Sequence, residues 1–176
     1  MKIKLVKPKI DYEQKLVNAI KEFFKVDNIK SGIEGSSNIV SYDSIQKWLD
    51  FINKKDLDSN LVPFIQYLVI NESDDLVGFV NIRLSLNSYL LNFGGHIGYS
   101  VVTSQRQKGY ATEILKQAIK ECQKNNIFEI LVTCKKDNII SEKVIRKNNG
   151  ILEDLREINQ IEYKRFWINK KNGNIS

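Results

Sequence analysis

The sequence predicts an α/β fold of the α+β type, with a mixed central sheet that carries helices on both faces. One observation is the order of segments, in which β-branched and aromatic runs alternate with segments that have apolar residues every three or four positions. A second is residues 94–118, where an alternating strand passes through a short turn into an amphipathic helix. The length of 176 residues suits a single domain, residues 1–176.

The expected elements follow from periodicity and from turn residues. Asp11, followed by Gln14, is predicted to cap the first helix as a capping box, and Asn138 to cap a short helix that stops at Gly150. The polar pair at 159–160 is expected to join two final antiparallel strands. In chain order we expect a strand at 2–7, a helix at 11–26, a loop at 27–40, a helix at 42–55, a hairpin of strands at 64–70 and 76–84, a helical turn around 89–91 over the core, a strand at 94–102, a helix at 108–124, a strand at 128–133, a helix at 139–147 and strands at 151–158 and 161–168.

The turn at residues 105–111 has the composition of a polyphosphate site. A strand that enters a helix through such a turn directs several backbone N–H groups at one point, where the helix dipole adds partial positive charge. Gly109 has no side chain, so a phosphate can approach the backbone there. The turn matches neither the GxxxxGK[ST] loop nor the GxGxxG of dinucleotide-binding folds.

This turn and three segments outside it carry a family resemblance. Residues 106–111 read R-x-x-G-x-A, residues 96–99 read His-Ile-Gly-Tyr, and residues 138–150 read N-x-x-S-x-x-V-I-x-K-N-x-G. Together with the closing strand at 165–168, these segments resemble the GNAT superfamily of acyl-CoA-dependent N-acetyltransferases, in particular an uncharacterised bacterial subgroup. The resemblance covers roughly residues 75–168.

The resemblance implies a GNAT-like, mostly antiparallel central sheet of six to seven strands with about four helices on its two faces. It also implies that the strand with His96 and the strand ending at Cys134 splay apart, and that the acyl arm of acetyl-CoA lies in the gap. The acceptor-substrate entrance would lie beside the helical region and loop near the N-terminus. The sequence of this region does not identify the acceptor.

The cofactor residues are likewise carried over from the resemblance. Backbone N–H groups from Gln107 to Thr112 would hold the pyrophosphate, and the side chains of Arg106 and Lys108 would either add charge or only border the site. Asn138 would contact the cofactor arm, cap a helix, or do both, and Ser141 would contact the cofactor or be a helix residue without a ligand. The full cofactor set is Tyr99, Ser100, Val101, Arg106, Gln107, Lys108, Gly109, Tyr110, Ala111, Thr112, Asn138, Ser141 and Lys143.

The catalytic assignments rest on chemistry. The attacking amine must be neutral, so a general base helps, and His96 is the only histidine of the chain. The alternative for His96 is a hydrogen bond on the sheet with no proton transfer. A backbone N–H near Val101 is the expected oxyanion donor. Many family members donate a proton to the leaving thiolate from a Tyr, but residues 144–145 are Val-Ile here, which leaves Tyr99, Tyr110 or water as the candidates.

Composition limits the other function classes. One His and two Cys without a CxxC motif argue against a metal site. The net charge of +6 comes from scattered lysines, so no nucleic-acid surface is expected, and no apolar run is long enough for a membrane span. Without a signal-peptide block at the N-terminus, a cytoplasmic protein is expected. A homodimer is left open, since the last hairpin could pair with another copy.

The sequence therefore predicts an N-acetyltransferase that passes the acetyl group of acetyl-CoA to an unknown amine by direct attack in a ternary complex. A catalytically silent acyl-CoA-binding module is the alternative. A basic nucleic-acid binder, which would bind DNA with a steep salt dependence, ranks last because the lysines are scattered.

Overall fold

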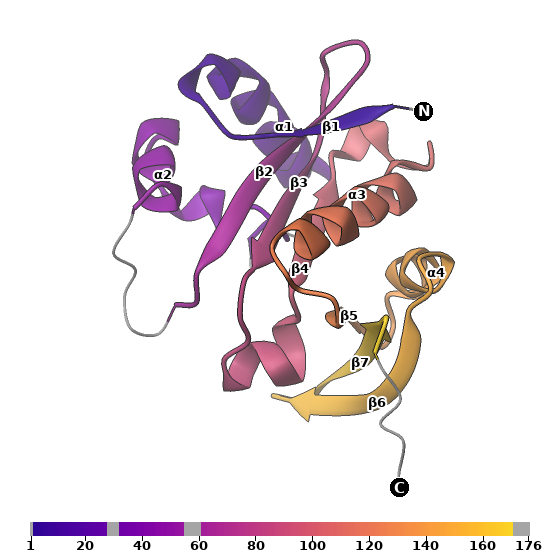
Figure 1. Ribbon diagram of the computed structural model, residues 1–176. Helices are drawn as coiled ribbons and strands as arrows, with labels where there is room; N and C mark the ends of the chain where they lie inside the picture. The colour runs from indigo at the N-terminus through magenta and orange to yellow at the C-terminus, as the bar shows by residue number, and fades with distance from the viewer. Residues whose placement is uncertain (1, 28–31, 55–60, 171–176) are drawn as a thin grey trace, which may run out of the picture.

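The computed structural model describes residues 2–27, 32–54 and 61–170, which form two antiparallel sheets surrounded by helices (Figure 1). The first sheet has the strand order β1-β2-β3-β4 and the second the order β5-β7-β6. The strands are β1 (Ile3–Val6), β2 (Phe64–Asn71), β3 (Leu76–Arg83), β4 (Ile97–Val101), β5 (Ile130–Lys135), β6 (Ile151–Ile158) and β7 (Ile161–Ile168).

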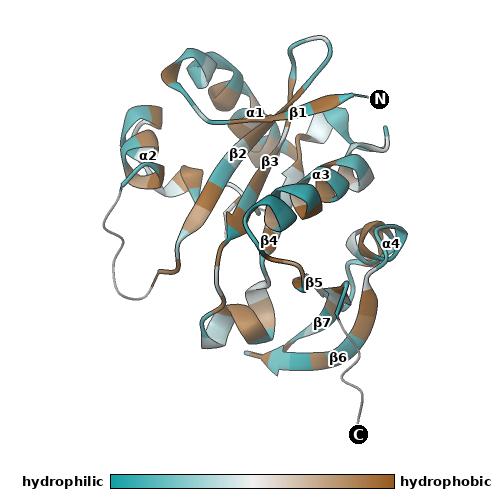
Figure 2. Cartoon of the chain, in the orientation of Figure 1, coloured by the Kyte–Doolittle hydropathy of each residue, from teal (hydrophilic) through white to brown (hydrophobic). Residues whose placement is uncertain are grey.

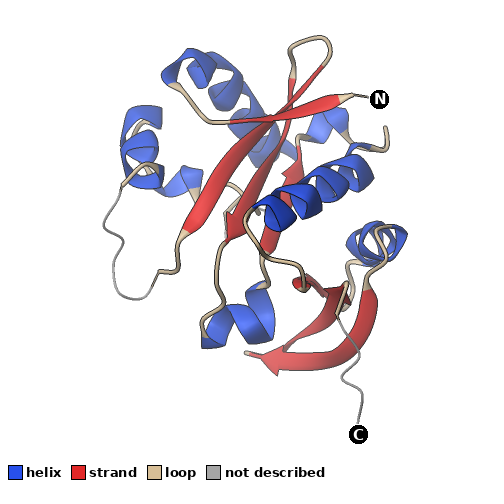
Figure 3. Cartoon of the chain, in the orientation of Figure 1, coloured by secondary structure: helices blue, strands red, loops and turns tan. Residues whose placement is uncertain are grey.

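Four α-helices cover the faces of the first sheet and the space between the sheets. Each helix carries hydrophilic residues on one side and hydrophobic residues on the other, as their periodicity predicts (Figure 2). Helices α1 (Glu13–Val26) and α2 (Ile45–Ile52) pack on one face of the first sheet, and α3 (Tyr110–Lys124) and α4 (Ile139–Lys147) lie on the other side (Figure 3). The predicted α+β class and the four helices on two faces are confirmed.

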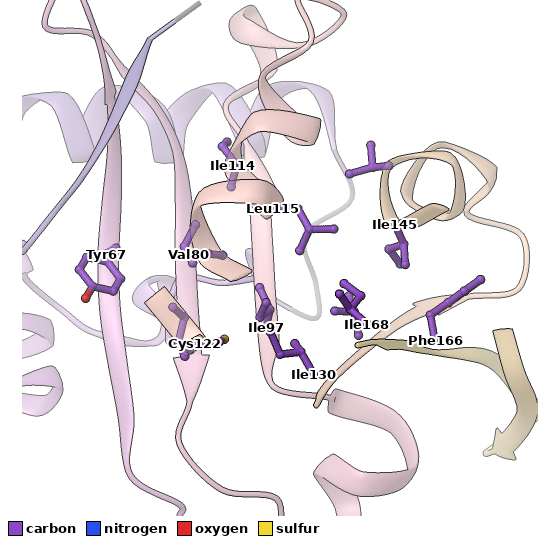
Figure 4. Close-up of a cluster of buried hydrophobic side chains, with 14 of the residues drawn as sticks. Tyr67, Val80, Ile97, Ile114, Leu115, Cys122, Ile130, Ile145, Phe166 and Ile168 are labelled. Atoms are coloured by element: carbon purple, nitrogen blue, oxygen red, sulfur yellow. The ribbon is translucent and has the colours of Figure 1, made fainter. Parts of the chain in front are cut away.

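The larger hydrophobic core joins the two sheets. Val80 of β3 and Ile97 of β4 meet Leu115 of α3 and Phe166 and Ile168 of β7, and all five side chains are buried (Figure 4). A second core, between the first sheet and α1 and α2, centres on Leu16, Trp48 and Phe79. Because the larger core takes residues from both sheets, the second sheet cannot detach without exposing it.

Strands β4 and β5 are the neighbouring edges of the two sheets, and no ladder joins them in the described residues. At one end they touch: the backbone N–H of His96 donates to the carbonyl oxygen of Leu131 at 2.7 Å. Beyond this contact each strand pairs only with its own sheet. The predicted splaying of the two strands is confirmed.

A five-residue π-helix, η3 (Leu90–Gly94), lies at the joined end of the split and bonds to both sheets. Its carbonyl groups accept hydrogen bonds from Arg83 of β3, Thr133 of β5 and Arg165 of β7. The sequence predicted a helical turn over the core here. The structure confirms the turn and shows that it also ties the sheets together.

Several predicted boundaries need correction. Asp11 lies in a short 3₁₀ helix, η1 (Ile10–Tyr12), and α1 begins at Glu13 with no side-chain cap, so the predicted capping box is absent. Helix α2 begins at Ile45, where the side chain of Ser44 accepts from the N–H of Lys47, because residues 39–41 form a separate 3₁₀ turn. Helix α2 ends at Ile52, before the predicted end at about residue 55, which itself lies outside the described residues.

Other corrections concern the second half of the chain. The strand expected from Gly94 begins at Ile97, so His96 precedes β4, and the strand expected at 128–133 is shifted to 130–135. Helix α4 and both final strands have the predicted bounds. At the end of α4 the left-handed residue is Asn149, with φ of 64°, and not Gly150.

Among the described helices, none combines the length and the apolar character that crossing a bilayer requires.

Candidate active site

The turn between β4 and α3 leaves a row of backbone donors without acceptors. After the 3₁₀ turn η4 (Thr103–Gln105), Gln107 and Gly109 have φ of 60° and 84°, and Gly109 occupies the N-cap position of α3. Within the described chain, no side chain caps this helix, and no backbone acceptor outside it takes the N–H groups of residues 107–112. Free N–H groups at a helix start are suited to an anion.

The side chain of Arg106 is engaged in structural contacts next to this turn. Its guanidinium donates to both carboxylate oxygens of Asp27, and its Nε donates to the carbonyl oxygen of Val101 at 3.2 Å. The hydrogen bond from Arg106 lowers the pKa of Asp27, and the guanidinium also lies 5.6 Å from the ring of Phe23. Arg106 therefore braces the turn against α1.

The other turn residues also make identifiable contacts. The exposed Lys108 donates from Nζ to Gln105 at 3.1 Å, and the hydroxyl of Tyr110 accepts from the side-chain amide of Asn71 at 3.3 Å. Ala111 packs against the larger core, and the carbonyl oxygen of Thr112 accepts from the side-chain amide of Asn148. Asn148, which also donates to the carbonyl oxygen of Val144, ties the end of α4 to the start of α3.

On the edge of β4 away from β3, alternate residues direct their backbone groups away from the sheet. Val102 and His96 bond to β3 at the two ends of the ladder, and in antiparallel pairs such bonds recur at every second residue. Ser100 therefore pairs with β3, whereas the N–H groups of Tyr99 and Val101 point toward β5. The hydroxyl of Ser100 is buried without a partner among the described residues.

Helix α4 begins beside this edge. Asn138 caps it, since its Oδ1 accepts from the N–H of Ser141 at 3.0 Å. This bond confirms the predicted cap and uses only the oxygen of the side chain, so the NH₂ group is left to donate elsewhere. Lys143 lies on the solvent side of the same helix.

Three weak acids gather across the gap. The hydroxyl of Tyr99, on β4, lies 3.3 Å from the hydroxyl of Ser141, on α4, and Ser141 also interacts with the thiol of Cys134, on β5. Burial raises the pKa of Tyr99 to about 12 and that of Cys134 to about 11. Both groups therefore keep their protons at neutral pH.

His96 is buried at the joined end of the split, with 7% of its surface exposed. Its Nδ1 accepts the N–H of Leu131 at 3.0 Å. Burial lowers the pKa of His96 to about 4, and the nearby Arg83 acts in the same direction. A neutral imidazole whose Nδ1 accepts a hydrogen bond carries its proton on Nε2, so the ring has no free lone pair for a second proton. This geometry opposes the predicted base role.

On the opposite face of β4, a loop at residues 32–38 covers a pocket of about 180 Å³. Glu34 and Arg83 line this pocket, and the Nη2 atom of Arg83 lies 3.6 Å from the Oε1 atom of Glu34. The sequence did not single out Glu34 or Arg83, and it included Asn148 in a motif without predicting its contacts, because these contacts join residues far apart in the chain. In the described residues, no cluster of three or more His, Cys, Asp or Glu side chains could hold a metal ion.

Comparison with solved structures shows the same fold in acetyltransferases of low sequence identity. The microcin C7 self-immunity acetyltransferase in complex with acetyl-CoA and AMP has a TM-score of 0.67 at 18% identity, over 96% of this chain and 92% of that one. A ribosomal L7/L12 α-N-protein acetyltransferase in complex with coenzyme A has a TM-score of 0.64 at 14% identity, over 94% and 93%. Mutant forms of a spermidine/spermine N-acetyltransferase from Vibrio cholerae give 0.61 at 15% identity, over 95% and 94%.

No curated protein matches the sequence. A family model described as acetyltransferase (GNAT) domain matches residues 30–150, which include the turn, the gap and α4. The match spans more than half of the chain and the fold agrees with it, so the chain belongs to the GNAT acetyltransferase family.

Proposed function

We propose that this protein transfers the acetyl group of acetyl-CoA to an amine, by direct attack of the amine while both substrates are bound. The observation that carries the proposal is the row of backbone N–H groups at residues 107–112, for which the described residues supply no acceptor outside α3, directly after β4, which forms no ladder with β5. Structural neighbours described as polyamine and protein α-amine acetyltransferases make an amine the natural acceptor class.

The residues along β4 and the following turn can bind the successive parts of acetyl-CoA, from the diphosphate to the thioester. Backbone N–H groups of residues 107–112 bind the diphosphate, and the NH₂ group of Asn138 is free to donate to the cofactor arm. The N–H groups of Tyr99 and Val101 pair with the arm as a neighbouring strand would, and the group nearer the thioester stabilises the oxyanion. When bound, acetyl-CoA supplies the thioester acyl group.

Not every residue predicted for the cofactor has this role in our proposal. Ser100 is paired with β3, and Arg106 holds the turn through Asp27, so both shape the site without reaching the cofactor. Lys108 and Lys143 are exposed and add positive charge near the phosphates. The contacts of Gln107, Gly109, Tyr110, Ala111 and Thr112 would come from their main chain.

The hydroxyl pair of Tyr99 and Ser141 is our proposal for the proton donor to the leaving thiolate. The raised pKa of Tyr99 keeps its proton available at neutral pH, and Ser141 lies within hydrogen-bonding distance of it. Tyr99→Phe and Ser141→Ala should each lower kcat by about tenfold to 100-fold while acetyl-CoA affinity changes little. Unchanged kcat in both variants would remove the pair from the mechanism.

For His96 we propose a structural role, in which its ring completes the contact between β4 and β5. His96→Asn offers an oxygen that can accept the N–H of Leu131 but cannot act as a base near neutral pH. We expect this variant to keep the pH dependence of kcat/KM. Loss of the acidic limb of that profile would restore His96 as the base.

Two measurements test the function itself. Calorimetry should detect acetyl-CoA binding, and thiol release should follow on mixing with acetyl-CoA and a panel of aliphatic, aromatic and peptide amines. Absence of binding would contradict the proposal. Binding without thiol release from any amine would leave the protein as an acyl-CoA-binding module.

A further inference from the structure

The loop at residues 32–38 is fixed to the sheet by a buried polar network. The side-chain amide of Gln66, on β2, donates to the carbonyl oxygen of Gly35 at 2.8 Å, and its oxygen accepts from Ser37 and from Asn81 of β3. Gln66 and Asn81 are 3% and 6% exposed. Breaking such a network leaves buried polar groups unpaired, so the loop has a defined position.

The same loop lies directly on the backbone of β4. Gly35 has φ of 73°, and a Cβ added there would come within 2.6 Å of the carbonyl oxygen of Gly98 and 2.7 Å of the Cα of Tyr99. Only a residue without a side chain allows this approach. Gly98 lies close to the end of a side chain of this loop, because a Cβ on it would meet Oε1 of Glu34 at 2.7 Å. The carboxylate of Glu34 therefore lies over Gly98.

Arg83 forms an ion pair with that carboxylate but no hydrogen bond to it. The Nη1 of Arg83 donates to the carbonyl oxygen of Gly94, and its Nη2 lies 3.6 Å from Glu34, beyond hydrogen-bonding distance. The side chain of Glu34 remains 69% exposed, compared with 18% for Arg83. Glu34 thus presents a carboxylate to a pocket whose other charged lining residue is Arg83 and whose neutral polar lining includes Ser37, Asn38 and Asn81.

The direction of the cofactor arm brings the thioester toward this pocket. In our proposed function the diphosphate is bound at residues 107–112 and the arm runs along β4 from Val101 toward Tyr99. The thioester then lies near Tyr99 and Gly98, before the strands join at His96 and close the gap. The carboxylate of Glu34 lies on the far side of Gly98 from the α3 core, on the face that the loop and α2 cover.

We propose that Glu34 binds the ammonium group of the acceptor, and that the acceptor is a cationic aliphatic primary amine. This inference rests on the proposed function. The carboxylate holds the ammonium, takes one of its protons and passes it to water, to which Glu34 is open. The amine nitrogen then forms a bond to the acyl carbon, the carbon–sulfur bond breaks, and the second proton ends on the coenzyme sulfur.

The test compares Glu34→Gln with Glu157→Gln, a matched change at an exposed glutamate on β6. Both variants are assayed with acetyl-CoA and a panel that contains cationic amines (spermidine, N-acetyl-lysine, a peptide with a free N-terminus) and neutral aromatic amines. With a cationic acceptor we expect Glu34→Gln to lower kcat/KM by about 100-fold, while acetyl-CoA affinity by calorimetry stays within twofold of wild type. Glu157→Gln should match the wild type.

The outcomes separate the inference from the proposed function. A wild-type protein that acetylates only neutral amines, or a Glu34→Gln variant within threefold of wild type on a cationic amine, overturns the inference and leaves the acetyltransferase intact. Failure of the wild type to acetylate any amine overturns both. Folding of the variant is checked by circular dichroism, and Glu34→Asp, which keeps the charge on a shorter side chain, should recover part of the lost rate.

Discussion

Gly109 adopts φ of 84° at the start of α3, a conformation that costs other L-residues about 1–2 kcal/mol. The turn therefore depends on a backbone conformation more than on charged side chains, and Arg106, one of its two cations, is already bound to Asp27. The sequence located this turn correctly because Gly109 and the helical stripe that follows are local signals. The partner of Arg106 was not predictable, since Asp27 is distant in the chain.

Replacing Gly109 tests the turn. Gly109→Val should weaken acetyl-CoA binding at least tenfold by calorimetry, because a β-branched residue resists this φ and crowds the phosphate position. Gly109→Asn is the control, since Asn tolerates left-handed φ and should lose less affinity. If both variants fold, as judged by helicity, and bind acetyl-CoA as the wild type does, the phosphate site lies elsewhere.

The lowered pKa of His96 predicts that the stability of the protein changes with pH. Its pKa is about 4 in the folded protein and 6.5 as a free side chain, so the unfolded chain binds more protons between these values. Wild-type stability should therefore fall as pH drops from about 6.5 to 4, by at most about 3 kcal/mol from this residue.

The variant His96→Asn lacks that titration, so its denaturant-unfolding free energy should depend less on pH in this interval. Carboxylates whose pKa values are lowered by ion pairs, such as Asp27 and Glu153, lose their contribution in acid in both proteins. Their effect therefore cancels in the difference. Parallel stability curves between pH 4 and 7 would show that His96 does not stay neutral.

Among the elements, α4 and the β6–β7 hairpin were predicted with their observed bounds. Their signals are local: Asn138 caps the helix, and the turn residues Asn159 and Gln160 both have positive φ. The first helix was misjudged at its start because a capping-box pattern also fits Asp11 in a 3₁₀ turn. The contacts of η3 with three strands could not be predicted, since they depend on the assembled sheets.

Asn138 allows its two roles to be separated. Asn138→Ala should lose about 1 kcal/mol of stability with the cap and also weaken acetyl-CoA binding. Asn138→Ser keeps an oxygen that can cap α4 but removes the NH₂ donor, so stability should be retained while affinity falls. Equal affinity in Asn138→Ser and wild type would limit Asn138 to the helix cap.

On the scale of the whole molecule, the larger core crosses from one sheet to the other, so the protein should unfold in one transition. Ile145 of α4 is fully buried in this core, whereas Ile140 on the same helix is 77% exposed. Ile145→Ala should lose about 2–5 kcal/mol in denaturant unfolding, and Ile140→Ala less than about 1 kcal/mol. Two separate transitions would mean that the second sheet folds independently.

The pocket at Glu34 also depends on how distant parts of the whole molecule come together. The family resemblance placed the acceptor entrance beside this loop, but no local pattern singled out Glu34, because the pocket arises where Gly35, Gly98 and the Gln66 network bring the loop onto a distant strand. Sequence patterns therefore predicted the cofactor side, which is one continuous segment, better than the acceptor side, which is assembled from three.

Amide hydrogen exchange with and without acetyl-CoA tests the central claim most directly, because it reports on the backbone N–H groups that are proposed to bind. We predict that acetyl-CoA slows exchange at residues 107–112 and at Tyr99 and Val101. Slowing confined to other segments, with residues 107–112 unchanged at saturating acetyl-CoA, would contradict the account.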